Sequence, residues 1–208
     1  MKNFYIVDHP LIKKDLTILR DKNTQPEIFR SALHRISNLL AAEISKNIIL
    51  EQTEVETPLE KTIGYKLKKQ IVLVPVLRAG LGMVNGFLEL IPDSKVGHIG
   101  LQRNEETLEP IEYYFKTPSE LEKSDVILLD PMLATGGSAS GAITYLKNRG
   151  AQTIYFACIV AAPSGVQRIN SDHPEVKIYS ASLDRELNNK GYILPGLGDA
   201  GDRTFGTL

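Results

Sequence analysis

Apolar residues recur with a helical period near the start of the chain and form short uninterrupted runs after residue 70. From about Thr24 to Asn47 they return every three or four positions, which predicts a helix with one buried stripe. Thr24 and Glu27 have the spacing of a capping box at its start. In the segment from Lys61 to Lys69, lysines alternate with apolar residues. We interpret it as a strand with one solvated face rather than a nucleic-acid patch.

Five short apolar runs predict the strands of a parallel sheet. They are IVLVPV (71–76), VGHIGL (96–101), DVILLD (125–130), TIYFACIV (153–160) and VKIYSA (176–181). Such runs are typical of strands covered on both faces, although Pro75 indicates that the first run ends there. We predict a helix capped by Ser138 and stopped by Gly150, and a second helix with Pro163 in its first turn. The expected fold is a single α/β domain over residues 1–208, with N-terminal helical material before an open, mostly parallel sheet flanked by helices.

Composition narrows the class of protein. The 208 residues include 24 Lys or Arg and 25 Asp or Glu, which argues against indiscriminate nucleic-acid binding. The sequence has no apolar run of the roughly 20 residues that a membrane span needs, and its start has no apolar signal segment. Its single cysteine, Cys158, excludes an internal disulfide, and its four histidines lack metal-ligand spacing. We therefore expect a cytoplasmic protein with no membrane partner, no nucleic-acid partner and no protein-held metal.

The segment VILLDPMLATGGSAS predicts a phosphate cradle. A strand delivers Asp130 to the edge of the sheet, and Thr135, Gly136, Gly137 and Ser138 turn the chain into the next helix. Adjacent glycines allow close approach of the backbone, while hydroxyls and free N–H groups converge on the ligand. The lysine of an ATPase P-loop is missing. The alternative is an ordinary tight turn between strand and helix.

Arg78 lies between a predicted strand and a glycine-containing turn in VPVLRAGLGMVNG. Its planar guanidinium suits bidentate binding of phosphate, whereas the alternative is an exposed arginine in a surface ion pair. Gly80 and Gly82 imitate a dinucleotide-binding fingerprint, but Asn85 stands where its third glycine belongs. A nicotinamide-dependent oxidoreductase is therefore disfavoured.

Two further segments complete the candidate site. We expect GYILPGLGDAGDRTFGT to form a hood-like ordered loop that holds a small flat polar ligand, the alternative being a free terminus. LQRNEETLEPIEYYFKTP predicts a hairpin or a lid that brings Arg103 onto a bound polyanion, the alternative being a solvated loop. The adjacent Glu105 and Glu106 point to opposite sides of an extended chain, so we do not expect a catalytic carboxylate pair.

Four segments in this order closely resemble the uracil phosphoribosyltransferases. They are RAGLGM, RNEETLEP, DPMLATGGS and GYILPGLGDAGDR, beginning at residues 78, 103, 130 and 191. The resemblance implies transfer of a 5-phosphoribosyl group from phosphoribosyl pyrophosphate to N1 of uracil, giving uridine monophosphate (UMP) and pyrophosphate in pyrimidine salvage. It also implies a phosphoribosyltransferase-like fold, a Mg2+ cofactor and a homo-oligomer. In some bacterial relatives GTP is an allosteric activator.

The resemblance also assigns roles, with Arg78, Arg103 and Asp130 as catalytic residues. It assigns phosphoribosyl pyrophosphate to Arg78, Arg103, Asp130, Pro131, Met132, Leu133, Ala134, Thr135, Gly136, Gly137, Ser138 and Asp199. It assigns uracil to Ile193, Gly198, Asp199 and Ala200, largely through backbone groups. Many relatives have two adjacent acids where Pro131 follows Asp130 here. We therefore expect substrate oxygens and water to hold most of the coordination of Mg2+.

A second function stays open at this point. A non-catalytic regulator could keep the donor cradle as a sensor and bind RNA, as some pyrimidine-linked relatives of the fold do. A basic face would favour that regulator. The near-neutral charge and the intact tail motif favour the enzyme.

Overall fold

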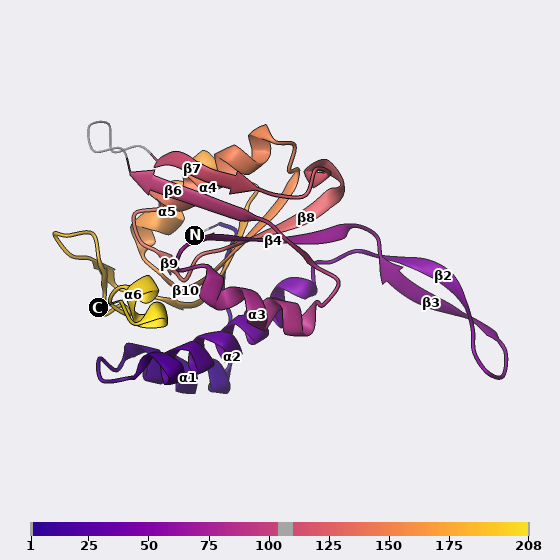
Figure 1. Ribbon diagram of the computed structural model, residues 1–208, viewed down its shortest axis with the longest axis horizontal. Coiled ribbons are helices and arrows are strands. Elements are labelled where there is room, and N and C mark those ends of the chain that lie inside the picture. Colours follow the sequence, from indigo (N-terminus) through magenta and orange to yellow (C-terminus); the bar gives the residue numbers. More distant parts are fainter. Residues whose placement is uncertain (1, 104–109, 208) are drawn as a thin grey trace.

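A mostly parallel sheet runs through the molecule and carries helices on both faces (Figure 1). The computed structural model describes residues 2–103 and 110–207. The strands of this sheet are β1 (Phe4–Ile6), β4 (Gln70–Leu77), β5 (Lys95–Val96), β6 (His98–Arg103), β7 (Pro110–Lys116), β8 (Ser124–Leu129), β9 (Met132–Leu133), β10 (Thr153–Ala161) and β11 (Lys177–Leu183). Their main order is β1-β11-β10-β8-β4-β6-β7, with β5 paired to β4 and β9 paired to β10. The predicted α/β fold class is confirmed.

Helices cover both faces of the sheet. They are α1 (Pro10–Arg20), α2 (Pro26–Ser45), α3 (Leu81–Leu90), α4 (Gly137–Asn148), α5 (Pro163–Asp172) and α6 (Ala200–Phe205), with a 3₁₀ turn at Leu121–Lys123. The first three lie on one face, and α4 and α5 lie on the other (Figure 1). Successive strand residues point to opposite faces, so Leu73 packs in the cluster under α1 to α3 and Val72 packs in the cluster under α4 and α5. Both faces are buried, which explains the uniformly apolar runs.

The carboxyl ends of β8, β4 and β6 meet at one edge of the sheet. These strands are neighbours and run parallel. Asp130 follows β8, Arg78 follows β4, and Arg103 is the last residue of β6. Open α/β sheets bind ligands at this edge. The prediction that Asp130 lies at this edge is therefore confirmed. Arg78 lies at the same edge, and the backbone of β6 ends there as well.

Each predicted run contains strand residues, but the expected end at Pro75 is wrong. β4 continues for two residues beyond Pro75. The Leu73 carbonyl accepts a hydrogen bond from Gly97 N–H at 2.9 Å, so Pro75, two residues further on, faces the same side. On that side β5 ends one residue before Gly97 and β6 begins one residue after it. Pro75, which has no N–H to donate, therefore faces the break between β5 and β6, the two strands that pair with this side of β4.

The start of α2 differs from the predicted capping box. Its N-cap residue is Gln25, without a side-chain cap bond, and Pro26 is the first helical residue. The Thr24 hydroxyl donates instead to the Ile18 carbonyl at 2.7 Å. Proline is preorganised for the first helical position. The helix therefore starts at proline, and the predicted pair of Thr24 and Glu27 is wrong.

The predictions for α4 and α5 are partly correct. Gly136 is the N-cap of α4, and Ser138 lies inside its first turn, so Ser138 as the cap is wrong. Gly150 just beyond the helix has a left-handed φ of 96°, as expected. Pro163 opens α5, also as expected.

A two-stranded hairpin projects away from the main sheet (Figure 1). It consists of β2 (Leu50–Glu56) paired antiparallel with β3 (Lys61–Leu67). The strand predicted for residues 61–69 is confirmed, but the expectation of a single solvated face is wrong. Ile63 and Tyr65 are 63% and 65% exposed, and Lys61 and Lys66 on the same strand are exposed as well. We call these two strands and their turn the arm.

The predicted hairpin after residue 100 is also present. β6 and β7 pair antiparallel, from His98 with Lys116 to Arg103 with Pro110. Residues 104–109, which include Glu105 and Glu106, lie outside the described residues. Within the described part of the chain, no helix has the length and apolar content needed to cross a membrane.

Candidate functional site

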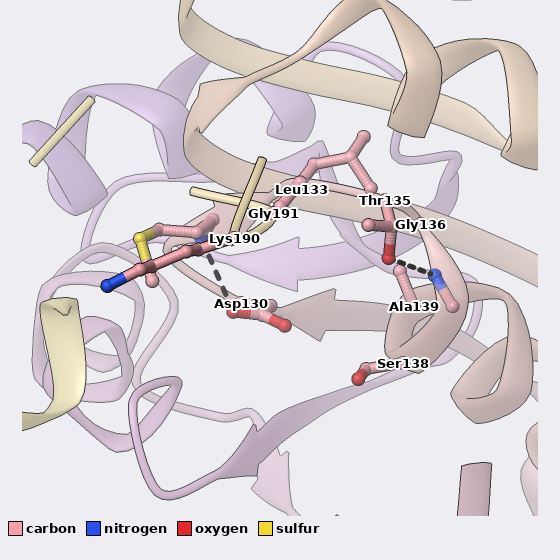
Figure 2. A pocket seen from close by; sticks show the side chains of 11 residues that line it. Asp130, Leu133, Thr135, Gly136, Ser138, Ala139, Lys190 and Gly191 are labelled. Carbon is pink, nitrogen blue, oxygen red and sulfur yellow. Dashed lines mark hydrogen bonds between the residues drawn. The ribbon is translucent and has the colours of Figure 1, made fainter. Parts of the chain in front are cut away.

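The phosphate cradle predicted after β8 surrounds a cavity of about 280 Å³. Its walls come from the strand end, β9 and the first turn of α4. They are Asp130, Met132, Leu133, Ala134, Thr135, Gly136, Gly137, Ser138 and Ala139, together with Lys190 and Gly191 from the tail. Asp130 lies between Lys190 on one side and Thr135 and Ser138 on the other (Figure 2). The cavity is polar and lies at the amino end of a helix, where the helix dipole favours an anion.

Two adjacent glycines shape the cradle in different ways. Gly136 has a φ of 80°, and a Cβ there would lie 3.0 Å from the carbonyl oxygen of Gly165 in α5. Gly136 is therefore required by the fold. At Gly137 a Cβ would meet only the Arg168 Nη1 at 3.6 Å and the Thr135 Oγ1 at 3.7 Å, which is ordinary contact. The fold therefore tolerates a side chain at Gly137, but the chain carries none beside the cavity.

Asp130 presents a carboxylate that is only weakly stabilised by the protein. Its Oδ1 accepts a hydrogen bond from Met132 N–H at 3.3 Å (Figure 2). Burial raises the pKa of the Asp130 carboxyl to about 7, and the Met132 bond opposes that rise. A carboxylate with unused acceptor capacity suits a ligand that donates hydrogen bonds, such as the hydroxyls of a ribose.

Arg78 stands beside the cradle and is held by the tail. Its Nη2 donates to Asp202 Oδ1 at 3.0 Å, and its side chain is 58% exposed. The Leu77–Arg78 peptide bond is cis. A Cβ on Gly80 would lie 2.3 Å from the carbonyl oxygen of Leu129, the residue before Asp130. Gly80 therefore allows direct packing of the Arg78 turn on the strand end and has no dinucleotide-binding role.

The ion pair of Arg78 agrees with the alternative of a surface pair, but its partner belongs to the candidate site. Asp202 also accepts from the Thr207 hydroxyl at 2.7 Å. These two donors, Thr207 first, hold the pKa of the Asp202 carboxyl below its usual value. The exposed guanidinium of Arg78 still has donors free for an incoming anion.

Arg103 is located only by its backbone. It is the last residue of β6, next to the end of β4, so the chain reaches the expected edge. Its side chain lies outside the described residues. The predicted contact between Arg103 and a polyanion stays a prediction.

The tail is held in a defined loop, so the alternative of a free terminus is wrong. The hairpin of β12 (Glu186–Leu187) and β13 (Ile193–Leu194) leads into a cis Leu194–Pro195 bond, and Gly196 and Gly198 have positive φ. Asp199 caps α6 by accepting from Asp202 N–H at 2.9 Å. Ala200 begins the helix and is fully buried.

The predicted residues fall into two groups. The residues from Asp130 to Ser138 belong to one strand–turn–helix segment, and all but Pro131 line the cavity. Arg78, Ile193, Gly198, Asp199 and Ala200 are absent from its walls. Within the second group, Gly201 joins the tail to the Arg78 turn, since a Cβ there would lie 3.2 Å from Asp199 Oδ1 and 3.7 Å from Ala79. The two groups meet where Gly80 of that turn packs on the Leu129 carbonyl.

Sequence reasoning missed Lys190 and Gly191, which close the cavity from the tail side (Figure 2). Gly191 has a φ of 80° and forms the turn that carries Lys190. A lysine placed before such a turn, directly ahead of GYILPGLG, was the available signal. Arg168 was missed as well, because it approaches the cradle from α5, which follows α4 and β10 in the chain.

No group of three or more His, Cys, Asp or Glu side chains within residues 2–103 and 110–207 is arranged to hold a metal ion. Of the cavity's walls, Asp130 supplies the carboxylate. Mg2+ accepts one or two protein carboxylates and completes its shell with water and phosphate oxygens. The residues therefore fit a Mg2+ ion that arrives with a phosphorylated ligand.

Comparison with known proteins identifies the family that shares this sequence and fold. A family model described as uracil phosphoribosyltransferase matches residues 6–207. Relatives with that name include proteins of Fervidobacterium nodosum, 57% identical over 98% of this chain and 99% of the relative, and Ligilactobacillus salivarius, 56% identical over 100% of both chains. The solved structure of the AQ2163 protein from Aquifex aeolicus has a TM-score of 0.91 at 40% identity and covers 97% of each chain.

A more distant structure shares the fold alone. The purine phosphoribosyltransferase from Pyrococcus horikoshii has a TM-score of 0.51 at 19% identity, covering 72% of this chain and 80% of that chain. The names of the similar full-length relatives favour the enzyme, and the RNA-binding regulator is not supported.

Proposed function

The chain belongs to the uracil phosphoribosyltransferase family, and we propose that it transfers the 5-phosphoribosyl group of phosphoribosyl pyrophosphate to N1 of uracil. The products are UMP and pyrophosphate, so the chain is a pentosyltransferase of uracil salvage. The observation that carries the proposal is the anion cradle of residues 130–138 beside Arg78 at one sheet edge. We treat residues 1–208 as one catalytic domain. Its cytoplasmic location stays a prediction.

In this proposal the donor's 5-phosphate binds at the start of α4. The hydroxyls of Thr135 and Ser138 and the free N–H groups of the first helical turn donate to its oxygens. Asp130 accepts hydrogen bonds from the ribose hydroxyls. Lys190 adds a positive charge on the opposite wall of the same cavity. The backbone of Pro131 to Ala134 completes the binding site for the donor's ribose 5-phosphate.

Arg78 and Arg103 are proposed to grip the leaving pyrophosphate. Breaking the bond from the anomeric carbon leaves positive charge on the ribose and gathers negative charge on the departing oxygens. Guanidinium donors aimed at those oxygens lower the barrier because they are charged before the reaction starts. Asp199 faces the donor from the tail. Arg78 is already held at the edge by Asp202, within reach of the α6 turn.

Uracil is proposed to bind at Ile193 and Gly198 to Ala200. Gly198 is exposed, and a Cβ there would meet Arg203 Cδ at 3.7 Å. A small flat base with alternating carbonyl and N–H groups pairs naturally with backbone donors and acceptors. Recognition by backbone hydrogen bonds suits uracil, because uracil carries no charge with which a charged side chain could pair.

The donor is proposed to bring Mg2+ with it. Asp130 is the described side chain best placed to contact the ion or its water shell. When bound, Mg2+ neutralises charge on the pyrophosphate oxygens and orients them. The chain itself contributes the arginine donors and the carboxylate, and we assign it no further metal ligand.

A direct assay tests the proposed reaction. The protein is mixed with uracil, phosphoribosyl pyrophosphate and Mg2+, and pyrophosphate release is followed. We expect release that requires all three components, and release that is independent of uracil would contradict the proposal. Repeating the assay with added GTP tests GTP as an allosteric activator, for which an unchanged kcat/KM counts as a negative result.

We expect Asp130→Asn to stabilise the fold at neutral pH. The folded pKa of the Asp130 carboxyl is raised from 3.8 to about 7. Between these values the folded chain binds more protons than the unfolded chain, so the free energy of unfolding falls as pH rises, and above about 7 the full cost remains. Asparagine removes the destabilisation caused by burying this charge, which amounts to up to about 4 kcal/mol. Urea unfolding should show a higher free energy of unfolding for the variant than for the original chain at pH 8, and this difference should shrink toward pH 4.

The same substitution should impair the reaction. Asparagine keeps one acceptor but loses the charge that strengthens a bond to a ribose hydroxyl, so kcat/KM for the donor should fall about 10-fold or more. Steady-state kinetics at pH 8 measure it. A stability gain that does not vary with pH would contradict the buried ionised state, and full activity would contradict the ribose contact.

The arm is proposed to join subunits of a homo-oligomer. Leu59 at its turn is 96% exposed, and Ile63 and Tyr65 on β3 are more than half exposed. Apolar side chains on a projecting hairpin gain free energy when a second copy covers them. Light scattering should show a smaller particle for the double variant Ile63→Glu, Tyr65→Glu and an unchanged one for Glu56→Gln. An unchanged mass for the double variant would exclude the arm as the contact.

A further inference from the structure

The buried Asp184 and the partly buried Arg20 bind the backbone of the tail loop two residues before Gly198. The Arg20 guanidinium pairs with both carboxylate oxygens of Asp184, at 2.8 and 2.6 Å. The same two side chains hold Gly196, whose carbonyl accepts from Arg20 at 3.0 Å and whose N–H donates to Asp184 at 2.9 Å. Both polar groups of this residue are thus fixed by side chains far away in the sequence.

Arg203 holds the next residue of the loop. It is 9% exposed, and its Nη1 donates to the carbonyls of Leu19 and Leu197, the latter at 2.7 Å. Its Nη2 donates to the carbonyl of Asp21 at 2.6 Å, and the guanidinium lies over the Phe29 ring, 4.5 Å from its centroid. One side chain therefore joins the tail loop to the end of α1.

This arrangement is unusual for a buried charge. Among residues 2–103 and 110–207, no carboxylate forms an ion pair with Arg203. Its described hydrogen-bond and ring partners are backbone carbonyls and Phe29, while the Asp21 carboxylate acts on its charge without forming an ion pair. Burying a charge without a paired carboxylate is expensive, and an apolar residue would fill the same space at lower cost. The three carbonyls, one of them in the tail loop, therefore indicate a role beyond packing.

The bond to Leu197 fixes the direction of the neighbouring N–H group. The Leu197–Gly198 peptide is not among the cis bonds of the described chain, so its C=O and N–H point in opposite directions in one plane. With the carbonyl turned toward Arg203, the Gly198 N–H points away from it. Gly198 is exposed, and its N–H has no acceptor within the described residues. This donor is thus oriented, free and next to the proposed base site.

We propose that Arg203 is a positioning residue for uracil recognition, which sets the orientation of the Gly198 N–H without touching the base. The inference rests on the proposed uracil site. The preceding residue of α6, Asp202, pairs with Arg78, so one helical turn connects the base loop with the arginine proposed for the leaving group. Preorganised donors bind a ligand without first being ordered, and loss of the clamp should therefore weaken uracil binding selectively.

The test is Arg203→Lys, which keeps the charge but loses the planar fork that spans three carbonyls. We expect the KM for uracil to rise at least tenfold, with the KM for the donor within twofold of the original. Arg185→Lys is the matched control, because Arg185 is an exposed tail arginine whose side chain, among the described residues, bonds only to Glu186. It should leave both constants unchanged. A merely structural role would instead lower the amount of active enzyme and leave both KM values alone, which would overturn the inference.

A second measurement separates the inference from the site on which it rests. Glycine-selective nitrogen-15 labelling gives a Gly198 amide signal, assigned by its loss in Gly198→Ala. In the original chain, saturating uracil with pyrophosphate present should shift that signal. No shift would overturn the uracil site itself. A shift that persists unchanged in Arg203→Lys would overturn the positioning role alone.

Folding of the variant is checked by thermal unfolding and by titration with the donor. If Arg203→Lys does not fold, Arg20→Lys carries the test, because it loosens the Gly196 carbonyl in the same loop. It should raise the KM for uracil in the same selective way. Equal rises in the KM for uracil and for the donor would contradict the proposal.

Discussion

Gly137→Val should reduce the affinity for phosphoribosyl pyrophosphate by at least about 100-fold while leaving the protein folded. Two lost charge-assisted hydrogen bonds of about 1.5–3 kcal/mol each are enough for that change. The added methyl groups occupy the approach to the first turn of α4, where the 5-phosphate is proposed to bind. The nearest atoms, on Arg168 and Thr135, lie at ordinary contact distance from the new Cβ. Calorimetric titration with the donor measures the loss.

The neighbouring glycine is the control. Gly136→Val places a branched side chain at a φ of 80° and against the Gly165 carbonyl at 3.0 Å. It should lower the free energy of unfolding by about 2–4 kcal/mol, from the left-handed backbone and the crowding together. Urea unfolding distinguishes the two variants. Normal donor affinity in a folded Gly137→Val protein would contradict the assigned phosphate seat.

Arg78→Lys should lower kcat/KM for the donor by about 100-fold, the typical effect of losing one preorganised contact to developing charge. Lysine retains the charge but cannot present two parallel donors to phosphate oxygens. Steady-state kinetics with varied donor at saturating uracil measure the effect, which should appear mainly in kcat if the contact tightens as the pyrophosphate departs.

Arg149→Lys serves as its control. Arg149 lies just past the far end of α4, where it pairs with Glu112 at 2.8 Å and stacks on Phe115. The control variant should keep kcat/KM within twofold. A similar loss in both variants would indicate a general effect of removing arginine, and an unchanged rate for Arg78→Lys would remove Arg78 from the site.

The parts of the fold that the sequence predicted depend on burial. The central strands carry long apolar runs because helices cover both faces, as at Val72 and Leu73. β1, an edge strand beside β11, was missed because its apolar run, FYI, is only three residues long and mostly exposed. The helix caps failed where a stronger local preference won, as when Pro26 rather than Thr24 set the start of α2.

The candidate site likewise has residues that could be predicted from the sequence and residues that could not. The cradle is contiguous in sequence, so Asp130 and the paired glycines could be recognised from the order of strand, turn and helix. Arg203 could not, because its role depends on contacts between distant parts of the chain. The bond between Arg203 and Leu19 spans 184 residues, and the pair of Arg20 and Asp184 spans 164. No local sequence pattern predicts contacts between residues that are so far apart in the chain.

The direct packing of Gly80 on the Leu129 carbonyl has a consequence for how this enzyme can change. A main-chain contact sets the spacing between the Arg78 turn and the strand end that carries Asp130, so side-chain replacement cannot change that spacing. The tail, by contrast, is fastened by a few side chains that substitution can exchange. New nucleobase preferences are thus most accessible through changes confined to the last quarter of the molecule, with the machinery for sugar transfer inherited intact.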